Sequence, residues 1–209
     1  MTPDYWQRAK RALIRRDAVL AKIIRSYPRI ALQRRGEPFR TLARSIVGQQ
    51  ISVKAAESVW NKVLVVAPDA LPGQILGARH SRLRECGLSE RKAEYIADLA
   101  RHFENGTIHA RDWPQMDDEA VIGELVQVRG IGRWTAEMFL MFNLLRPDVL
   151  PLDDLGLQKA ICLHYFNGRR GPPKRLRARM RKVAENWAPW RSVATWYLWR
   201  SLDPVPVEY

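Results

Sequence analysis

The stretch that decides the fold is residues 125–159, LVQVRGIGRWTAEMFLMFNLLRPDVLPLDDLGLQK. It begins with the end of an apolar helix, passes through Gly130-Ile131-Gly132, and predicts a new helix from about Arg133 to Leu145. Two glycines around one apolar residue allow a tight turn with outward-pointing N–H groups, and these groups and the next helix N-terminus can bind a phosphate. A plain turn between two helices is the alternative. The neighbouring Arg129 and Arg133 favour the phosphate site.

Two adjacent aspartates follow in the segment Pro151-Leu152-Asp153-Asp154-Leu155-Gly156. They precede an apolar helical run, so one of them can cap that helix, and we expect Asp153 to do so. Asp154 is then free to face a cleft. A carboxylate there can stabilise the positive sugar that develops when a glycosidic bond breaks, or orient a water that attacks the sugar. A purely structural cap is the alternative.

The rest of the chain shows helical periodicity. Phe39, Leu42 and Ile46 recur at steps of three and four residues, and Ser52 and Ser89 stand where helix N-caps are expected. Prolines and glycines divide the chain into roughly ten short helices, and no convincing alternating strand pattern is present. The sequence therefore predicts an all-α fold.

The charge indicates a polyanionic partner. The 209 residues include 35 Lys and Arg against 22 Asp and Glu, which gives a formal net charge of +13. A folded domain this basic usually binds nucleic acid, although a merely soluble basic surface is the alternative. A dense basic run lies within residues 174–182, and a solvated helix face and a DNA contact are equally compatible with it.

Composition narrows the cellular setting. The two cysteines, Cys86 and Cys162, are too few for a four-cysteine iron–sulfur site and form no metal-ligand cluster. The sequence has no apolar run of about 18 residues and no signal-peptide pattern. We therefore expect a cytoplasmic protein, associated with the nucleoid if bacterial, that does not act at a membrane.

Several motifs together resemble one family. The run from Gly130 to Ala136, followed by Leu152-Asp153-Asp154, resembles the helix-hairpin-helix, Gly/Pro-rich loop and Asp signature of DNA glycosylases. Three further segments resemble the DNA-3-methyladenine glycosylase II branch of that superfamily: Ser45–Ser52, Gly87–Ala93 and Trp187–Ser192. The resemblance extends from about Tyr5 to Leu202.

The resemblance implies a fold of two helical lobes with the active-site cleft between them. Residues 1–209 would form a single glycosylase domain in the compact form that lacks an N-terminal β lobe. The central lobe would span about 35–150 and end in the helix-hairpin-helix at about 117–145. Residues 1–34 and 151–209 would form the second lobe.

The resemblance also implies roles for particular residues. Asp154 would be catalytic, and Gln50 would be the wedge that fills the gap left by a flipped base. The base pocket would consist of Trp134, Met138, Leu155, Trp199 and Gln49, and the phosphate site of Arg129, Gly130, Gly132 and Arg133. Hairpin carbonyls near Val128 and Gly130 can hold a monovalent cation in such proteins, and no other cofactor is implied. Met138 and Leu155 stand where some relatives carry tyrosines, which leaves the base preference open.

The implied function is DNA repair. The chain would bind double-stranded DNA as a monomer, flip out alkylated purines of the 3-methyladenine and 7-methylguanine type, and hydrolyse the N-glycosidic bond. It would have no lyase activity, because Trp134 occupies the place of the lysine nucleophile of bifunctional relatives and Arg133 stays protonated. Lys159, beyond Asp154, should point away from the cleft. The alternatives are a glycosylase for a deaminated or oxidised base and a non-catalytic helix-hairpin-helix DNA-binding protein.

Overall fold

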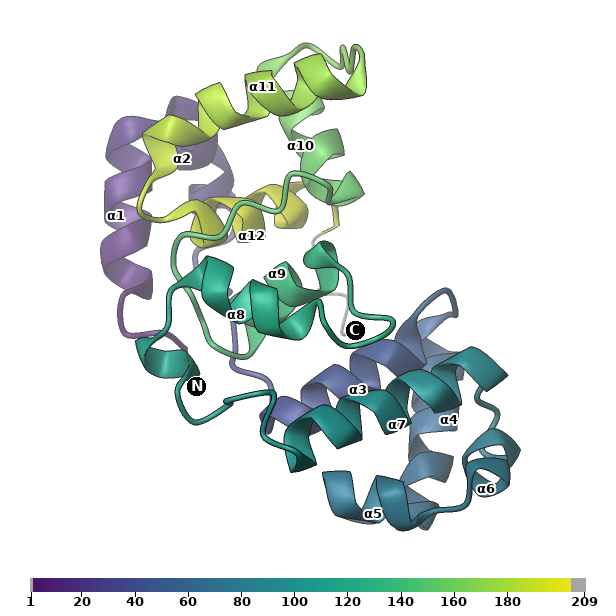
Figure 1. Ribbon diagram of the computed structural model, residues 1–209. Coiled ribbons are helices and arrows are strands. Elements are labelled where there is room, and N and C mark those ends of the chain that lie inside the picture. The colour runs from purple at the N-terminus through teal and green to yellow at the C-terminus, as the bar shows by residue number, and fades with distance from the viewer. Residues whose placement is uncertain (1, 204–209) are drawn as a thin grey trace. The chain divides into compact units, whose positions relative to one another are not determined.

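The computed structural model describes residues 2–203, which form helices and no strand (Figure 1), so the prediction of an all-α fold is confirmed. The helices that precede the hairpin are α1 (Trp6–Arg16), α2 (Ala18–Ser26), α3 (Pro38–Gly48), α4 (Val53–Val66), α5 (Pro72–Gly77), α6 (His80–Glu85), α7 (Glu90–Glu104) and η1 (Trp113–Gln115). The remaining helices are α8 (Asp118–Leu125), α9 (Arg133–Phe142), α10 (Leu155–Tyr165), α11 (Pro173–Ala184), η2 (Glu185–Trp187) and α12 (Arg191–Leu202). None of these helices within residues 2–203 has the length and apolar character needed to cross a bilayer.

The described residues form two compact units. The first unit combines residues 2–34 with 140–203, and the second comprises residues 35–139. The resemblance implied that the central lobe ends near residue 150, whereas the second unit ends at Phe139, within α9. The reason is that residues 140–150 contact the helices of the first unit: Phe142 packs against Trp196, and Arg191 donates to Asp148 at 2.7 Å.

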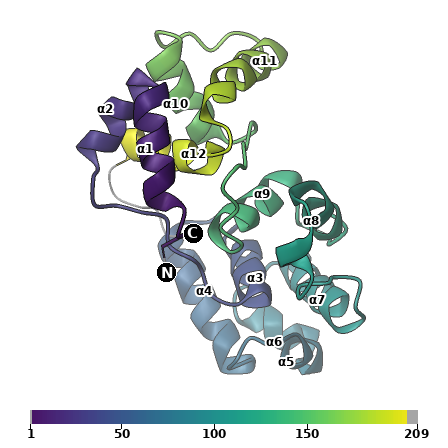
Figure 2. The same ribbon diagram turned by 90° about the vertical axis from the view of Figure 1, so that its left-hand side faces the viewer.

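The first unit is built around α12. Residues 192–198 of this helix are all buried, since α1, α2 and α10 pack around it (Figure 2). A helix that is buried on every side needs neighbours on every side. At the edge of this core the buried Asp17 carboxylate accepts hydrogen bonds at 2.9 Å from Tyr165 Oη and Trp187 Nε1.

The second unit is built around α7, which packs against α3, α5 and α6. An aromatic row of edge-to-face contacts connects its elements, from Phe39 through Phe103 and Trp113 to Phe139 at centroid distances of 5.3, 6.2 and 5.1 Å. Edge-to-face packing is favourable because the positive ring edge meets the negative ring face. These contacts fix η1 and α9 against α7.

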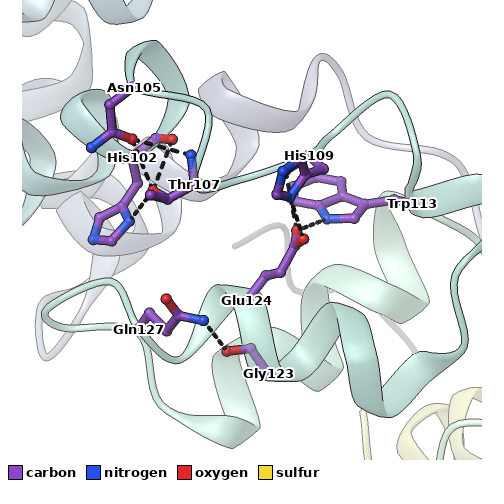
Figure 3. Close-up of polar contacts among 8 residues, drawn as sticks. All are labelled: His102, Asn105, Thr107, His109, Trp113, Gly123, Glu124 and Gln127. Carbon is purple, nitrogen blue, oxygen red and sulfur yellow. Dashed lines mark hydrogen bonds and ion pairs between the residues drawn. The ribbon is translucent and has the colours of Figure 1, made fainter.

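Figure 3 shows how the segment before α8 is held. Glu124 on α8 accepts hydrogen bonds at 2.7 Å from His109 Nδ1 and from Trp113 Nε1. Because Trp113 is fully buried, this carboxylate connects α8 to the core of the second unit. The first helix of the hairpin is thereby anchored.

Candidate functional site

The hairpin turn, residues 126–132, joins α8 to α9 and has the predicted form. Ile131 is only 4% exposed, and its amide donates to Val128 O at 3.1 Å, so it points inward and holds the two helices together. Gly130 has φ +86°, and a Cβ atom there would lie 2.2 Å from Tyr95 Cδ2. Only glycine fits this position, because both the backbone conformation and the space exclude a side chain.

Gly132 differs from Gly130. It is exposed, and a Cβ atom there would have no other atom within 4 Å. Within residues 2–203 its amide donates no hydrogen bond, and it lies directly before the N-terminus of α9. An exposed amide at a helix N-terminus is suited to an anion, since the helix dipole points its positive end there.

Both arginines of the predicted phosphate site are paired with carboxylates. The Arg129 Nη2 group donates to Glu94 at 2.9 Å. The Arg133 guanidinium donates to Glu119 through both Nη groups and to Glu137 through Nε. The hydrogen bond from Arg133 lowers the pKa of Glu119, and the same pair raises the pKa of Arg133. The positive charge of the hairpin is thus largely compensated by protein carboxylates.

The loop that carries the predicted wedge, residues 48–52 (here the wedge loop), connects α3 to α4 beside the hairpin turn. Gln50 is exposed and has φ +58°, a conformation that non-glycine residues rarely adopt without support. The neighbouring Gln49 does not point away from the protein, because its Nε2 donates to Gly130 O at 2.8 Å. The structure therefore connects the wedge loop to the hairpin through Gln49.

Lys92 is a supporting residue that the sequence analysis missed. Its ammonium group donates to Val47 O at 2.8 Å and to Gln49 O at 2.6 Å, which satisfies carbonyls at the C-terminal end of α3. Burial lowers the pKa of this lysine. No sequence signal identifies the contact, since Lys92 lies in the first turn of α7, 43 residues from Gln49.

The carbonyls predicted to hold a cation both accept protein donors. Val128 O accepts the Ile131 amide, and Gly130 O accepts the Gln49 side chain. Each carbonyl oxygen keeps a second lone pair, so the cation implied by the resemblance stays a prediction. Within residues 2–203 no group of three His, Cys, Asp or Glu side chains is placed to bind a metal ion.

Asp154, in the first unit, is the N-cap of α10. Its Oδ1 accepts hydrogen bonds from the amide of Leu157 at 2.6 Å and from Trp199 Nε1 at 2.8 Å. The prediction that Asp153 caps this helix and leaves the Asp154 carboxylate free was wrong. The helix begins at Leu155, so the cap position falls on Asp154, while Asp153 is exposed and accepts from Arg177 Nε at 2.7 Å.

Two further residues define the setting of Asp154. The ring of Trp199 stacks on Phe142 at a centroid distance of 6.0 Å and an angle of 11°, which fixes the indole that donates to the carboxylate. A Cβ atom at Gly156 would lie 3.1 Å from Trp199 Cδ1 and 3.2 Å from Asp154 Oδ1. Phe142 and Gly156 were not predicted, because their importance depends on their contacts with Trp199 of α12, which lies far away in sequence.

The structure places the remaining predicted pocket residues on its surface or near it. Leu155 is 68% exposed in the first unit. In the second unit Trp134 is 41% exposed and Met138 is partly exposed. Of the predicted residues, the structure brings Asp154 together with Trp199 and brings Gln49 together with Gly130.

Known proteins are similar in sequence to this chain over most of its length. The family described as "HhH-GPD superfamily base excision DNA repair protein" matches residues 43–186. DNA-3-methyladenine glycosylase 1 of Schizosaccharomyces pombe is 32% identical over 186 residues, which cover 87% of this chain and 80% of the relative.

Solved structures lead to the same family. A DNA-3-methyladenine glycosidase from Bacillus halodurans superimposes with a TM-score of 0.83 at 35% identity, covering 93% of this chain and 89% of that one. The S. pombe 3-methyladenine DNA glycosylase in complex with abasic DNA gives a TM-score of 0.76 at 28% identity, covering 96% and 100%. The chain therefore belongs to the HhH-GPD superfamily of base excision DNA repair proteins and, within it, to the DNA-3-methyladenine glycosylase family.

Proposed function

We propose that this chain is a monofunctional DNA glycosylase that releases alkylated purines, of the 3-methyladenine and 7-methylguanine type, and leaves an abasic site. The observation that carries the proposal is the Asp154 carboxylate, fixed at a helix N-terminus by a backbone amide and the Trp199 indole. Support comes from the glycosylase relatives and from the exposed amide of the hairpin turn.

The positive charge of an alkylated purine determines how its N-glycosidic bond can be broken. An N3- or N7-alkylated purine is cationic, so the N-glycosidic bond can break with its electron pair leaving on the base, which departs neutral. The positive charge that develops on the sugar is stabilised by a nearby fixed anion. Asp154 supplies this anion, and hydrogen bonds from the Leu157 amide and the Trp199 indole hold its carboxylate in position at the N-terminus of α10. Water then adds to the sugar carbon and loses a proton.

The available amines argue for hydrolysis over strand cleavage. A lyase needs a neutral lysine amine that forms a Schiff base with the sugar. Trp134 occupies the hairpin position of that lysine, and the ion pair with Glu119 keeps Arg133 protonated. Lys159 lies in α10 and is exposed, whereas Asp154 is only 9% exposed. The lysine amine therefore does not share the buried position of the carboxylate and is not placed to attack the same sugar.

The decisive experiment is incubation of the protein with duplex DNA treated with a methylating agent. We expect chromatography to identify free 3-methyladenine and 7-methylguanine, with no covalent adduct after borohydride is added and no strand nick without added base. Parallel duplexes carrying uracil or 8-oxoguanine test the other lesion classes. Binding to methylated DNA without release of any base would make the protein a DNA-binding module.

Gln50→Ala tests the proposed wedge. Extrusion of a nucleotide costs a few kcal/mol, so removing the side chain that fills the gap should slow it by roughly 10-fold. A fluorescent base analogue beside the lesion reports extrusion, and affinity for undamaged duplex should stay the same. Gln50→Asn keeps the amide and should recover part of the rate. Unaltered extrusion in Gln50→Ala would assign the wedge to another side chain.

Lys92→Met tests how the wedge loop is supported. Methionine removes both hydrogen bonds to the carbonyls of Val47 and Gln49, each worth about 1.5–3 kcal/mol for a charged donor. We expect slower extrusion in the same fluorescence assay, with catalysis on an already unpaired lesion nearly unchanged. Lys92→Arg keeps a cationic donor and should recover extrusion. Equal losses on paired and unpaired lesions would show a general folding defect instead.

A further inference from the structure

The basic segment at residues 169–182 has an unusual charge. Its fourteen residues contain eight Lys and Arg and no Asp or Glu, so it supplies eight of the chain's 13 excess positive charges. Most of the segment belongs to α11 (Pro173–Ala184), in the first unit, where Figures 1 and 2 show it beside α10. Like charges at this density repel one another unless an external anion compensates them.

The buried side of α11 turns the charges outward. Leu176, Met180 and Ala184 recur every four residues and are buried, which fixes one stripe of the helix against the unit. The remaining positions carry the charges. Four of these charged residues are exposed, and within residues 2–203 their side chains make no hydrogen bond or ion pair; these are the α11 basic face, Lys174, Arg175, Arg181 and Lys182.

Two other basic side chains of the segment contact residues close to the proposed catalytic carboxylate. Arg177 Nε donates to Asp153, the residue before Asp154. Arg170 Nη2 donates at 2.7 Å to Gln158 of α10. Arg170 and Arg177 line one pocket together with Asp153, Leu155, Gln158, Pro173 and Leu176. The α11 basic face is therefore held beside the N-terminus of α10.

The arginines of the hairpin differ from the α11 basic face because they are paired with carboxylates. There Arg129 is paired with Glu94, and Arg133 is paired with Glu119 and Glu137, so the arginine charges are compensated within the protein. The hairpin offers DNA mainly backbone amides. Phosphate contacts that contribute strongly to affinity require cations that are not already neutralised. On α11, by contrast, four exposed cations have no carboxylate partner within residues 2–203.

We infer that the α11 basic face, with Arg170 beside it, is a second contact for the DNA phosphate backbone, on the unit that carries Asp154. This inference deepens the proposed function: the contact grips backbone phosphates that flank the nucleotide presented to Asp154. It carries no base information, because it reaches phosphates and not base edges.

The test compares three double variants with equal charge loss. Arg175→Gln/Lys182→Gln and Lys174→Gln/Arg181→Gln remove α11 charges, and Arg11→Gln/Arg15→Gln is the control. Arg11 and Arg15 are exposed on α1 of the same unit, and within residues 2–203 their side chains make no hydrogen bond or ion pair. Affinity for an undamaged duplex is measured across a series of salt concentrations.

Each phosphate contact contributes about 0.9 to the slope of log affinity against log salt. We expect the slope to become shallower by about 1.8 in each α11 double variant and to stay at the wild-type value in the control. On methylated DNA the α11 variants should need more enzyme to reach half-maximal rate, with the maximal single-turnover rate unchanged. Equal slopes in all four proteins would overturn the inference.

Two further outcomes separate the alternatives. Binding to phosphatidylserine vesicles that depends on α11, with an unchanged DNA slope, would assign the face to a membrane and overturn the inference. A wild type that shows the α11-dependent slope on undamaged duplex but releases no base would support the DNA contact while refuting the proposed glycosylase function. Failure of the contact and failure of the enzyme activity are thus distinguishable.

Discussion

Asp154→Asn is expected to lower the single-turnover rate of base release by about 100-fold or more, the scale of losing a main electrostatic stabiliser. Asparagine has the same shape and caps helices as well as aspartate does, so its oxygen can still accept from Leu157 and Trp199. The fold should therefore remain, and only the negative charge is removed. The rate is measured with enzyme in excess over methylated DNA, together with the melting temperature and the DNA affinity, which should stay similar or rise.

Asp153→Asn is the matched control for that experiment. It removes the same charge one residue away, at an exposed side chain whose ion pair with Arg177 is worth about 0–1 kcal/mol. We expect base release within a few-fold of wild type, and the structure gives no reason to expect loss of a helix cap. If Asp154→Asn kept wild-type activity, or if both variants lost the same amount, Asp154 would not be the catalytic carboxylate.

Gly130→Ala is expected to have the largest effect on stability. Alanine at φ +86° costs about 1–3 kcal/mol in backbone strain. Its Cβ would overlap the Tyr95 ring at 2.2 Å, and overpacking of this kind adds about 1–3 kcal/mol. Urea unfolding should show a loss of about 3 kcal/mol or more, and binding to every DNA sequence should weaken together because the hairpin turn is distorted.

Gly132→Val separates the fold of the hairpin from its contact with DNA. A Cβ atom at Gly132 has no other atom within 4 Å and so does not clash with the fold, and the free energy of unfolding should change by about 1 kcal/mol or less. The same side chain would stand in front of the exposed amide and keep a phosphate away, which weakens binding regardless of base sequence. A variant with altered base preference and intact affinity would refute the phosphate site at this turn.

Local patterns in the sequence were sufficient to predict the helices of the fold. Ser52 and Ser89 cap α4 and α7 through amides three residues ahead, and the apolar Ile131 between its two glycines is buried. These features depend on interactions within one helical turn, or on the periodicity of a single helix, so they can be predicted from the sequence. The same local information made the hairpin recognisable and the all-α fold predictable.

The tertiary structure alone decided how the predicted residues are held. Asp154 meets Trp199 across 45 residues, and Lys92 meets Gln49 across 43. The carboxylates that neutralise Arg133 come from α8 and α9, and the boundary between the units falls within α9 because Phe142 and Asp148 contact α12. Such partners depend on which helices pack together, and packing is determined by the buried surfaces of many residues at once. The sequence by itself therefore determined the helices and the family, whereas the three-dimensional packing decided which side chains fix the proposed carboxylate, support the wedge loop and leave α11 uncompensated.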